Sequence, residues 1–595
     1  MATTIDLHYV FYTAEPTREN WNKISRGHGC IEKFALGDSR VAKLLSEVAR
    51  INGADPRHTE MWRLKEPKLS SPRQVSALLV ANDHNITRIA DEVVPAQLLA
   101  DALGANWAEA AKQTIFVFFL PPAPTPKVKD DELADEEDDV LAGLYKGFNS
   151  FLSASASGPT PSVAAKSTEY NKIQGSATAI LDGRFCVDGS ATTAPPIELY
   201  HPAFSQFIAA CNNSDPIPEE HLRLTSALMR KLSAIAESRR DEETQNIIDQ
   251  LLGAALETTP NQDEWSADFC HLTATPFNVS AADLIVEVKA ELGTDNLDPS
   301  VQSSFSFTRF WIHDVRKPIR DACCCPSFLI GLAGPWIIIL AAVITSRPIV
   351  QRLTPYLWFG CSRALDDQQV LNLARPLYAL KSALANLKDY YSSLQPIPRI
   401  DNRLHSRFCP SITQYRDRGK LIPFKYIRPL QRDATCVTYR IEIDGEPAVV
   451  KFVQQYSKDA HEFMAKQGFA PELRYYGLLG DGYGNLGMVV MAWVEGKTLY
   501  EVYGAGTLPE DVRTNVREAL DILNQSEFVF GDLRRPNIMV SDSDQSIKFI
   551  DFDWAGKSEE VRYPFHLSSF IRDAAGAKEY DYITVAHQDA LFERL

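Results

Sequence analysis

"VFGDLRRPNIMV" at residues 529–540 and "IKFIDFDWAG" at residues 547–556 decide how the last third of this chain is expected to fold. The first stretch places Asp532 five residues before Asn537, and the apolar residues after the asparagine begin a strand. The second stretch reads as the hairpin partner of that strand and delivers Asp551. Phosphoryl transfer depends mainly on positioning and on charge, so it needs carboxylates and an amide beside Mg²⁺. This spacing predicts a catalytic loop at Asp532 and a Mg²⁺ site at Asn537 and Asp551.

A lysine for the nucleotide phosphates is expected upstream of this loop. "EPAVVKF" at 446–452 places Lys451 in a strand, and "AHEFMAKQGF" at 460–469 offers Glu462 on a helix as its ion-pair partner. "MVVMAWVEGKTL" at 488–499 has the form of a hinge that holds adenine. Each feature alone is common in structural roles, but their order and spacing together are specific. They predict ATP and Mg²⁺ as ligands.

Residues 430–595 resemble the protein-kinase-like superfamily, with departures. The stretch at 429–443, where a Gly-rich loop would lie, contains no glycine, and Phe530 and Gly531 stand where the HRD motif has histidine and arginine. Asp553 replaces the DFG glycine, where it either adds a metal ligand or stiffens the turn. The resemblance implies an ATP-dependent kinase or a nucleotide-binding regulator without transfer activity.

A second set of charged residues lies in "AADLIVEVKAELG" at 281–293. Strand alternation puts Asp283, Ile285, Glu287 and Lys289 on one face. Buried charges need partners, so this face is either solvated or binds something. Metal-dependent phosphodiester hydrolysis uses such a set, because carboxylates hold Mg²⁺ or Mn²⁺ while a lysine orients the attacking water.

A Glu-x-Lys strand preceded by an acidic residue on a neighbouring strand is similar to the restriction-endonuclease-like fold. The resemblance implies DNA as a partner, pairing of two nuclease units as a homo- or hetero-dimer, and a glutamine of the Q-x-x-x-Y type on the following helix. Asp283 is a rival for the first carboxylate, and Ser306 stands at the tyrosine position of the glutamine motif. A zinc site at Cys323–Cys325 is disfavoured, because adjacent cysteines do not easily converge on one ion. The implied site comprises Asp268 and Glu287 as metal ligands, Glu243 as an extra ligand, Lys289 beside the attacking water, and Gln302.

The whole chain has the composition of a soluble globular protein with several cores. It has 595 residues, of which 45% are hydrophobic and 23% charged. The net charge of −16 opposes general affinity for nucleic acid, although a local groove remains compatible with it. Ten cysteines without a paired pattern indicate a reducing compartment. "FLIGLAGPWIIILAAVIT" at 328–345 is expected to form two buried strands around a Gly-Pro turn, so no membrane span is expected.

The predicted fold class is multidomain, α/β and α+β. In the first part, strand-like "IDLHYVFYT" at 5–13 and "TIFVFFLPP" at 114–122 flank helical runs such as 95–112. An acidic tract follows, in which eight of the ten residues 130–139 are Asp or Glu, and it favours a solvated spacer. The predicted parts are a small ubiquitin-like α+β header at 1–122, an acidic and Ser/Pro-rich linker at 123–165, a restriction-endonuclease-like α/β domain at 195–400, and a compact protein-kinase-like domain at 405–595.

This order of parts, with "HTEMWRLKEPKL" at 58–69 and the strand "FVFFLPP" at 116–122, resembles a crinkler-family effector of the fungal type. The resemblance implies export without an ordinary signal peptide and action inside a target cell, in its nucleus; otherwise the protein is intracellular. In that interpretation the nuclease part cuts DNA, while the kinase-like part regulates it or phosphorylates a protein substrate. Two alternatives stay open: a protein kinase with an inactive nuclease-fold scaffold, and a non-catalytic interaction protein.

Overall fold

The structure is a computed structural model. It describes five N-terminal strands and residues 132–595, except 177, 187–190, 236–241, 259–266, 295–296, 365, 397–403 and 432–434. The chain divides into two compact units, Met1–Val128 and Lys129–Leu595. At this level the predicted multidomain mixture of α and β structure is confirmed.

The first unit contains a mixed five-stranded sheet with the order β2-β1-β5-β3-β4. Strands β1 and β5 are parallel neighbours, and the other pairs are antiparallel. The strands predicted at 5–13 and 114–122 are confirmed as β1 and β5, whereas the helix predicted at 95–112 lies outside the described residues. The strands are β1 Thr4–Tyr12, β2 Arg26–Ala35, β3 Glu60–Leu64, β4 Ala90–Glu92 and β5 Phe116–Phe119.

A second sheet in the order β10-β9-β8-β7-β6 forms the centre of the middle part of the chain. The apolar run at 328–345 forms the hairpin β8–β9, so the prediction of two buried strands is confirmed. The turn contains Gly334 at φ +55, and none of the helices in the described residues could cross a membrane. The strands are β6 Phe269–Thr273, β7 Ala281–Lys289, β8 Ser327–Ala333, β9 Trp336–Ile344, β10 Pro348–Arg352 and the short β11 Leu357–Trp358 beside β9.

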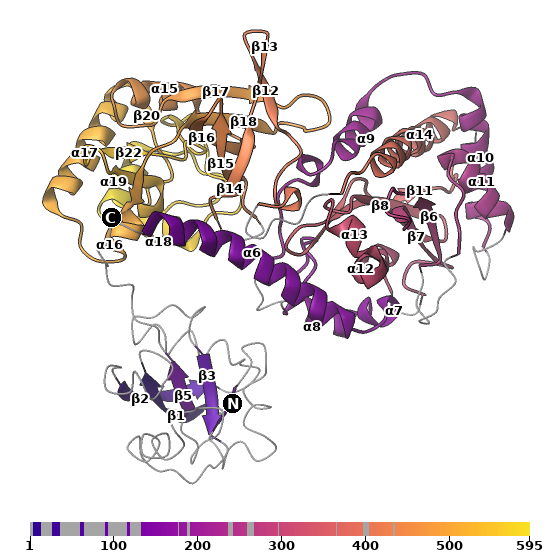
Figure 1. The fold of residues 1–595 in the computed structure, drawn as a ribbon, viewed down its shortest axis with the longest axis horizontal. Coiled ribbons are helices and arrows are strands. Elements are labelled where there is room, and N and C mark those ends of the chain that lie inside the picture. The colour runs from indigo at the N-terminus through magenta and orange to yellow at the C-terminus, as the bar shows by residue number, and fades with distance from the viewer. Residues whose placement is uncertain are drawn as a thin grey trace. The chain divides into compact units, whose positions relative to one another are not determined.

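Helices cover both faces of this sheet (Figure 1). Leu284, Val286 and Val288 of β7 pack on one side, and Ile285 packs on the other, so the predicted alternation is confirmed. The first face is covered by α9 Pro202–Asn212, α10 Glu219–Ser233, α11 Glu242–Leu252 and α14 Asp367–Ser392. The second is covered by α6 Glu132–Ala156, α7 Pro161–Ala164, α8 Ser167–Gln174 and α12 Pro299–Ile312, with α13 Lys317–Arg320 following.

The segment predicted as a solvated linker at 123–165 contains the long helix α6. From Val140 onward its apolar side chains recur every three or four residues, and Val140, Leu144, Phe148 and Phe151 are buried. The interpretation of the segment as a solvated spacer is therefore wrong from Val140 to the end of α6. The periodic apolar stripe outweighs the Ser- and Ala-rich composition that suggested a linker.

The C-terminal part begins with an antiparallel sheet in the order β14-β15-β16-β18-β17, followed by helices and short hairpins. The sheet strands are β14 Lys425–Pro429, β15 Thr438–Ile443, β16 Glu446–Val453, β17 Leu473–Leu478 and β18 Gly487–Ala492, after a β12 Gln414–Asp417 and β13 Lys420–Pro423 hairpin. The helices are α15 Lys458–Lys466, α16 Leu499–Tyr503, α17 Glu510–Gln525, α18 Ser569–Ala575 and α19 Val585–Phe592. The short strands are β19 Gly496–Thr498, β20 Phe528–Val529, β21 Ile538–Ser541, β22 Ile547–Phe549 and β23 Gly556–Lys557.

The middle and C-terminal parts share a core within the second compact unit. Leu199, from the short helix before α9, is fully buried among the side chains of β15, β16 and β18. Its carbonyl oxygen accepts a hydrogen bond from the backbone N–H of Ser411 at 2.7 Å. The loop between β17 and β18 contacts α9, since a Cβ on Gly482 would overlap the carbonyl oxygen of Ser205. These contacts join the two parts.

Candidate functional site

The hairpin β21–β22 brings the predicted catalytic residues of the C-terminal part together. Asp532 and Asn537 lie in the loop between β20 and β21, and Asp551 follows β22. The side-chain amide of Asn537 donates to the backbone oxygen of Asp532 at 3.0 Å. The backbone oxygen of Asn537 accepts from the N–H of Ile550 at 2.9 Å, which fixes the chain just before Asp551. The sequence spacing is therefore realised as one compact polar site.

Lys451 reaches this site from β16. Its side chain is 10% exposed, and its Nζ lies 2.7 Å from Oδ1 of Asp551 and 2.7 Å from Oδ2 of Asp553. Burial alone would lower the pKa of Lys451, but the two carboxylates outweigh burial and raise it. The buried ammonium therefore stays charged, as a group that holds phosphates must.

Asp551 is held in an uncommon backbone conformation, with φ at +72. A residue other than glycine rarely adopts this region, and such conformations are concentrated at functional sites. Burial raises the pKa of its carboxyl, but Lys451 more than offsets this effect and the pKa lies below its ordinary value. By contrast, burial and the neighbouring charge of Asp551 raise the pKa of Asp553 to about 7. Asp551 is thus the more strongly ionised carboxylate of the pair.

Asp532 forms a bidentate ion pair with an arginine of its own loop. Its carboxylate is buried and accepts from Nε of Arg534 at 2.5 Å and also from Nη2 of the same guanidinium. Burial raises the pKa of Asp532, and Arg534 opposes that rise. Sequence reasoning did not assign a role to Arg534, although the string "GDLRRPN" contained it. In this state both carboxylate oxygens of the predicted catalytic residue are engaged.

The predicted ion pair between Lys451 and Glu462 is absent. The Glu462 side chain is 40% exposed and lies 3.6 Å from Lys458 on the same helix. The preceding residue, His461, points inward instead, and its ring nitrogens interact with Tyr456 at 2.5 Å and with the carbonyl oxygen of Pro471 at 2.8 Å. The prediction for Glu462 is wrong because the inward face of α15 is occupied by the imidazole.

The remaining donors fit Mg²⁺ and ATP phosphates. Asn537 and Asp551 carry the amide and carboxylate oxygens that Mg²⁺ prefers. The amide nitrogen of Asn537 donates to the backbone oxygen of Asp532, so its side-chain oxygen is the atom that could bind a metal ion. Among the described residues, no cluster of three or more His, Cys, Asp or Glu side chains could hold a metal ion. In the segment predicted to hold adenine, the indole N–H of Trp493 is buried and has no hydrogen-bond partner.

The middle part contains a separate cluster around Glu287. This carboxylate is fully buried and accepts from Nε2 of Gln302 at 2.6 Å and from Oγ of Ser306 at 2.5 Å, both on α12. Asp268, just before β6, accepts from the backbone N–H of Val288 at 2.7 Å. Lys289 is the half-buried last residue of β7. The structure therefore brings Glu287 and Gln302 into contact, and it gives Ser306 a role as a hydrogen-bond donor where a tyrosine was expected.

Two other predicted ligands do not join Glu287. Glu243 is exposed on α11 and forms an ion pair with Lys231, and α11 packs on the opposite face of the sheet from α12. Asp283 accepts from Thr273 and interacts with Nδ1 of His271, each at 2.7 Å. This hydrogen bond raises the pKa of His271. Glu243 is therefore wrong as an extra ligand, and Asp283 belongs to a structural network with β6.

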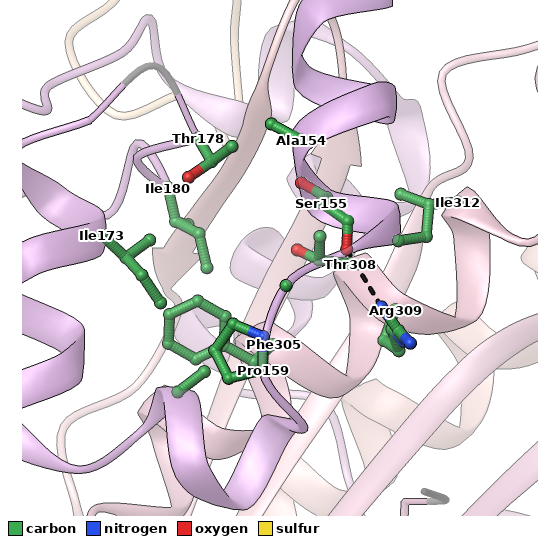
Figure 2. A pocket seen from close by; sticks show the side chains of 12 residues that line it. Ala154, Ser155, Pro159, Ile173, Thr178, Ile180, Phe305, Thr308, Arg309 and Ile312 are labelled. Atoms are coloured by element: carbon green, nitrogen blue, oxygen red, sulfur yellow. Dashed lines mark hydrogen bonds between the residues drawn. The ribbon is translucent and has the colours of Figure 1, made fainter. Parts of the chain in front are cut away.

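A pocket in the middle part opens between the end of α6, α8 and α12 (Figure 2). None of the predicted site residues lines it. Arg309 at its rim donates to the backbone oxygens of Ser155 and Ala156 at 3.0 Å each, so it fastens α12 to the end of α6. The lining is mostly apolar and includes Ile173, Ile180, Phe305 and Ile312.

No protein-family model matches the chain, and no curated protein matches it. Many solved structures match, among them the kinase PK-1 of the Cydia pomonella granulovirus, at 13% identity with a TM-score of 0.24. The match covers 28% of this chain and 65% of that kinase.

Proposed function

We propose that residues 405–595 bind ATP with Mg²⁺ and transfer its terminal phosphoryl group to an acceptor hydroxyl. The observation that carries this proposal is the 2.7 Å contact between Lys451 and Asp551, next to Asn537 and Asp532. A buried lysine, two carboxylates and an amide in this order are the parts that positioning of a phosphoryl group requires.

Each residue has a separate role in this proposal. Lys451 holds the phosphates, and Asn537 and Asp551 would hold Mg²⁺, which when bound offsets the negative charge of the phosphates. Asp532 accepts the proton of the acceptor hydroxyl. Arg534 donates to both oxygens of Asp532, and each oxygen keeps a second lone pair that can accept the hydroxyl proton.

The test is nucleotide binding followed by transfer. Thermal unfolding of the full chain is measured with and without MgATP for the wild type, Lys451→Ala and Lys458→Ala; the last variant removes an exposed lysine from α15. We expect MgATP to stabilise the wild type and Lys458→Ala but not Lys451→Ala. Incorporation of labelled phosphate, abolished by Asp532→Asn, then separates a kinase from a nucleotide-binding regulator. A wild type that MgATP does not stabilise contradicts the proposal.

A second candidate function is Mg²⁺- or Mn²⁺-dependent cleavage of DNA by the middle part. It is supported by the contact of Glu287 with Gln302 and by the position of Asp268 just before β6, the strand beside β7. Plasmid cleavage is assayed with either metal, with and without ATP, beside Lys289→Ala. Cleavage that the variant lacks favours a nuclease, and an effect of ATP favours regulation by the kinase-like part. Absence of cleavage favours the alternative of a kinase with an inactive scaffold.

The wider role of a delivered effector is also a proposal. The sheet has the order β2-β1-β5-β3-β4, and β1 and β5, the first and last strands along the chain, are parallel neighbours within it. This order supports a ubiquitin-like header. Export, nuclear action and a protein substrate rest on the resemblance in the order of parts. Microscopy of a tagged full chain introduced into a host cell tests the nuclear location.

A further inference from the structure

We propose that Asp553 is the carboxylate that positions Lys451, in the role for which the sequence pointed to Glu462. This inference rests on the proposed phosphoryl transfer. It concerns how the lysine is held, and it makes Asp553 a positioning residue that acts through Lys451.

The first observation is that one buried ammonium lies between two carboxylates. Lys451 is 2.7 Å from both Asp551 and Asp553, and both aspartates are only partly exposed, at 30% and 29% of their side chains. A buried lysine needs hydrogen-bond acceptors and a counter-ion. If Asp551 turns toward a metal ion, Asp553 still satisfies the lysine. Two carboxylates therefore allow one to be used elsewhere without leaving the ammonium unpaired.

The second observation is that α15 cannot supply the counter-ion. His461 is fully buried, and its ring lies parallel to that of Phe552 with centroids 4.5 Å apart and planes at 4°. Successive residues on a helix differ by about 100° in direction, so turning Glu462 inward would expel His461 from this stack. Glu462 instead pairs with Lys458 at the surface. The packing of His461 therefore fixes the rotation of α15 about its axis, with Glu462 at the surface.

The arrangement predicts how the site works. The residue that binds metal and the residue that orients the lysine lie two positions apart in one loop, "DFD" at 551–553. Lysine placement therefore does not require a movement of α15. Both carboxylates that contact Lys451 come from this one loop.

The experiment uses the full chain and compares Asp553→Asn with Glu462→Gln, each an isosteric loss of charge. We expect Asp553→Asn to lower kcat for phosphoryl transfer by about 10- to 100-fold, while KM for ATP and the Mg²⁺ concentration for half-maximal rate change by less than about threefold. Glu462→Gln is expected to match the wild type. Asp553→Glu, which keeps the charge but displaces it by one methylene, is expected to fall between the two.

A double-mutant comparison adds a readout that does not need activity. The melting temperatures of Asp553→Asn, Lys451→Met and the double variant are measured without nucleotide, and we expect the double variant to lose less than the sum of the single losses. Additive losses would overturn the proposal, and so would a loss of activity in Glu462→Gln equal to that in Asp553→Asn. A raised Mg²⁺ requirement at unchanged maximal rate would instead make Asp553 a metal ligand. If Asp553→Asn does not fold, Asp553→Glu provides the test. A kcat of Asp553→Glu equal to that of the wild type would overturn the proposal. Failure of the proposed function is distinguished because the wild type itself would then not bind ATP.

Discussion

The imidazole of His461 lies flat against the ring of Phe552, with centroids 4.5 Å apart. Phe552 is the residue between Asp551 and Asp553, so this stack ties helix α15 to the loop that carries both carboxylates. Burial lowers the pKa of the His461 imidazole to about 4 from its ordinary value of 6.5, so the buried ring is neutral at pH 7.

Acid should therefore weaken the fold through His461. Because the folded-state pKa is lower than the unfolded one, the unfolded chain binds more protons between about pH 6.5 and 4. The stabilisation is complete above pH 6.5 and is lost as the pH falls toward 4, by up to about 3 kcal/mol. His461→Phe removes this titration and preserves an aromatic ring. Urea unfolding from pH 7.5 to 4.5 should show a shallower loss of stability in the variant. Equal slopes would contradict this assignment.

Arg534→Ala is expected to move the acidic limb of the pH–rate profile to higher pH. Burial raises the pKa of Asp532 and Arg534 opposes the rise, so loss of the guanidinium removes the opposing effect. A base must be deprotonated to act, and a neighbouring opposite charge lowers the pKa of a carboxyl. The acidic limb of kcat/KM should therefore shift to higher pH in Arg534→Ala. Arg534→Lys, which keeps the charge without the bidentate contact, should shift less; an unmoved limb in Arg534→Ala would refute the assignment.

Ser306→Ala is expected to destabilise the middle part by about 1.5–3 kcal/mol, because it removes a hydrogen bond to the fully buried Glu287 carboxylate. Ser304→Ala is the matched control, since Ser304 is equally buried on the same helix but donates only to the backbone oxygen of Ser300 at 2.8 Å. We expect a smaller effect there, about 1 kcal/mol. The measurement is urea unfolding. Similar losses in both variants would mean that Glu287 does not depend on Ser306.

Gly482→Ala tests the contact between the middle and C-terminal parts. Gly482 and Gly480 lie in the same loop with φ at +84 and +99, so alanine strains the backbone at either position. Only at Gly482 would the new Cβ meet a neighbour, the carbonyl oxygen of Ser205 on α9, whereas space is open at Gly480. Gly482→Ala should lower the melting temperature more than Gly480→Ala and speed proteolysis of the β17–β18 loop. Equal behaviour would show that this contact does not stabilise the unit.

Local patterns predicted the parts of the site that lie close together in sequence. The spacing from Asp532 to Asn537 and the hairpin to Asp551 are local, and the structure places them as expected. Alternation along β7 likewise put Glu287 on the same face as Ile285, because a strand's two faces follow from its period of two, and the structure shows that α12 covers this face.

The failures concern the phase and the packing of helices. Whether α15 turns His461 or Glu462 inward depends on the fit of one ring against Phe552, a contact between segments about ninety residues apart that no local pattern encodes. Glu243 failed because the side of the sheet to which a helix docks depends on the whole core. The role of Asp553 could have been predicted from the sequence. An aspartate replaces a glycine in the loop expected to lie near the strand lysine Lys451, and such a replacement suggests an ion pair.

Leu199 makes the middle part of the chain necessary for the core of the C-terminal part. It is fully buried among side chains of the C-terminal sheet, yet it belongs to the segment that leads into α9. A fragment that starts at residue 405 would leave an apolar hollow open to water, and a fragment that stops at 400 would carry an exposed leucine. The boundary between the two sites is therefore not a boundary between independently folding pieces. A shortened protein meant to keep the C-terminal site should retain residues 129–404 as well, and a gene rearrangement that separated the middle and C-terminal parts would divide one core.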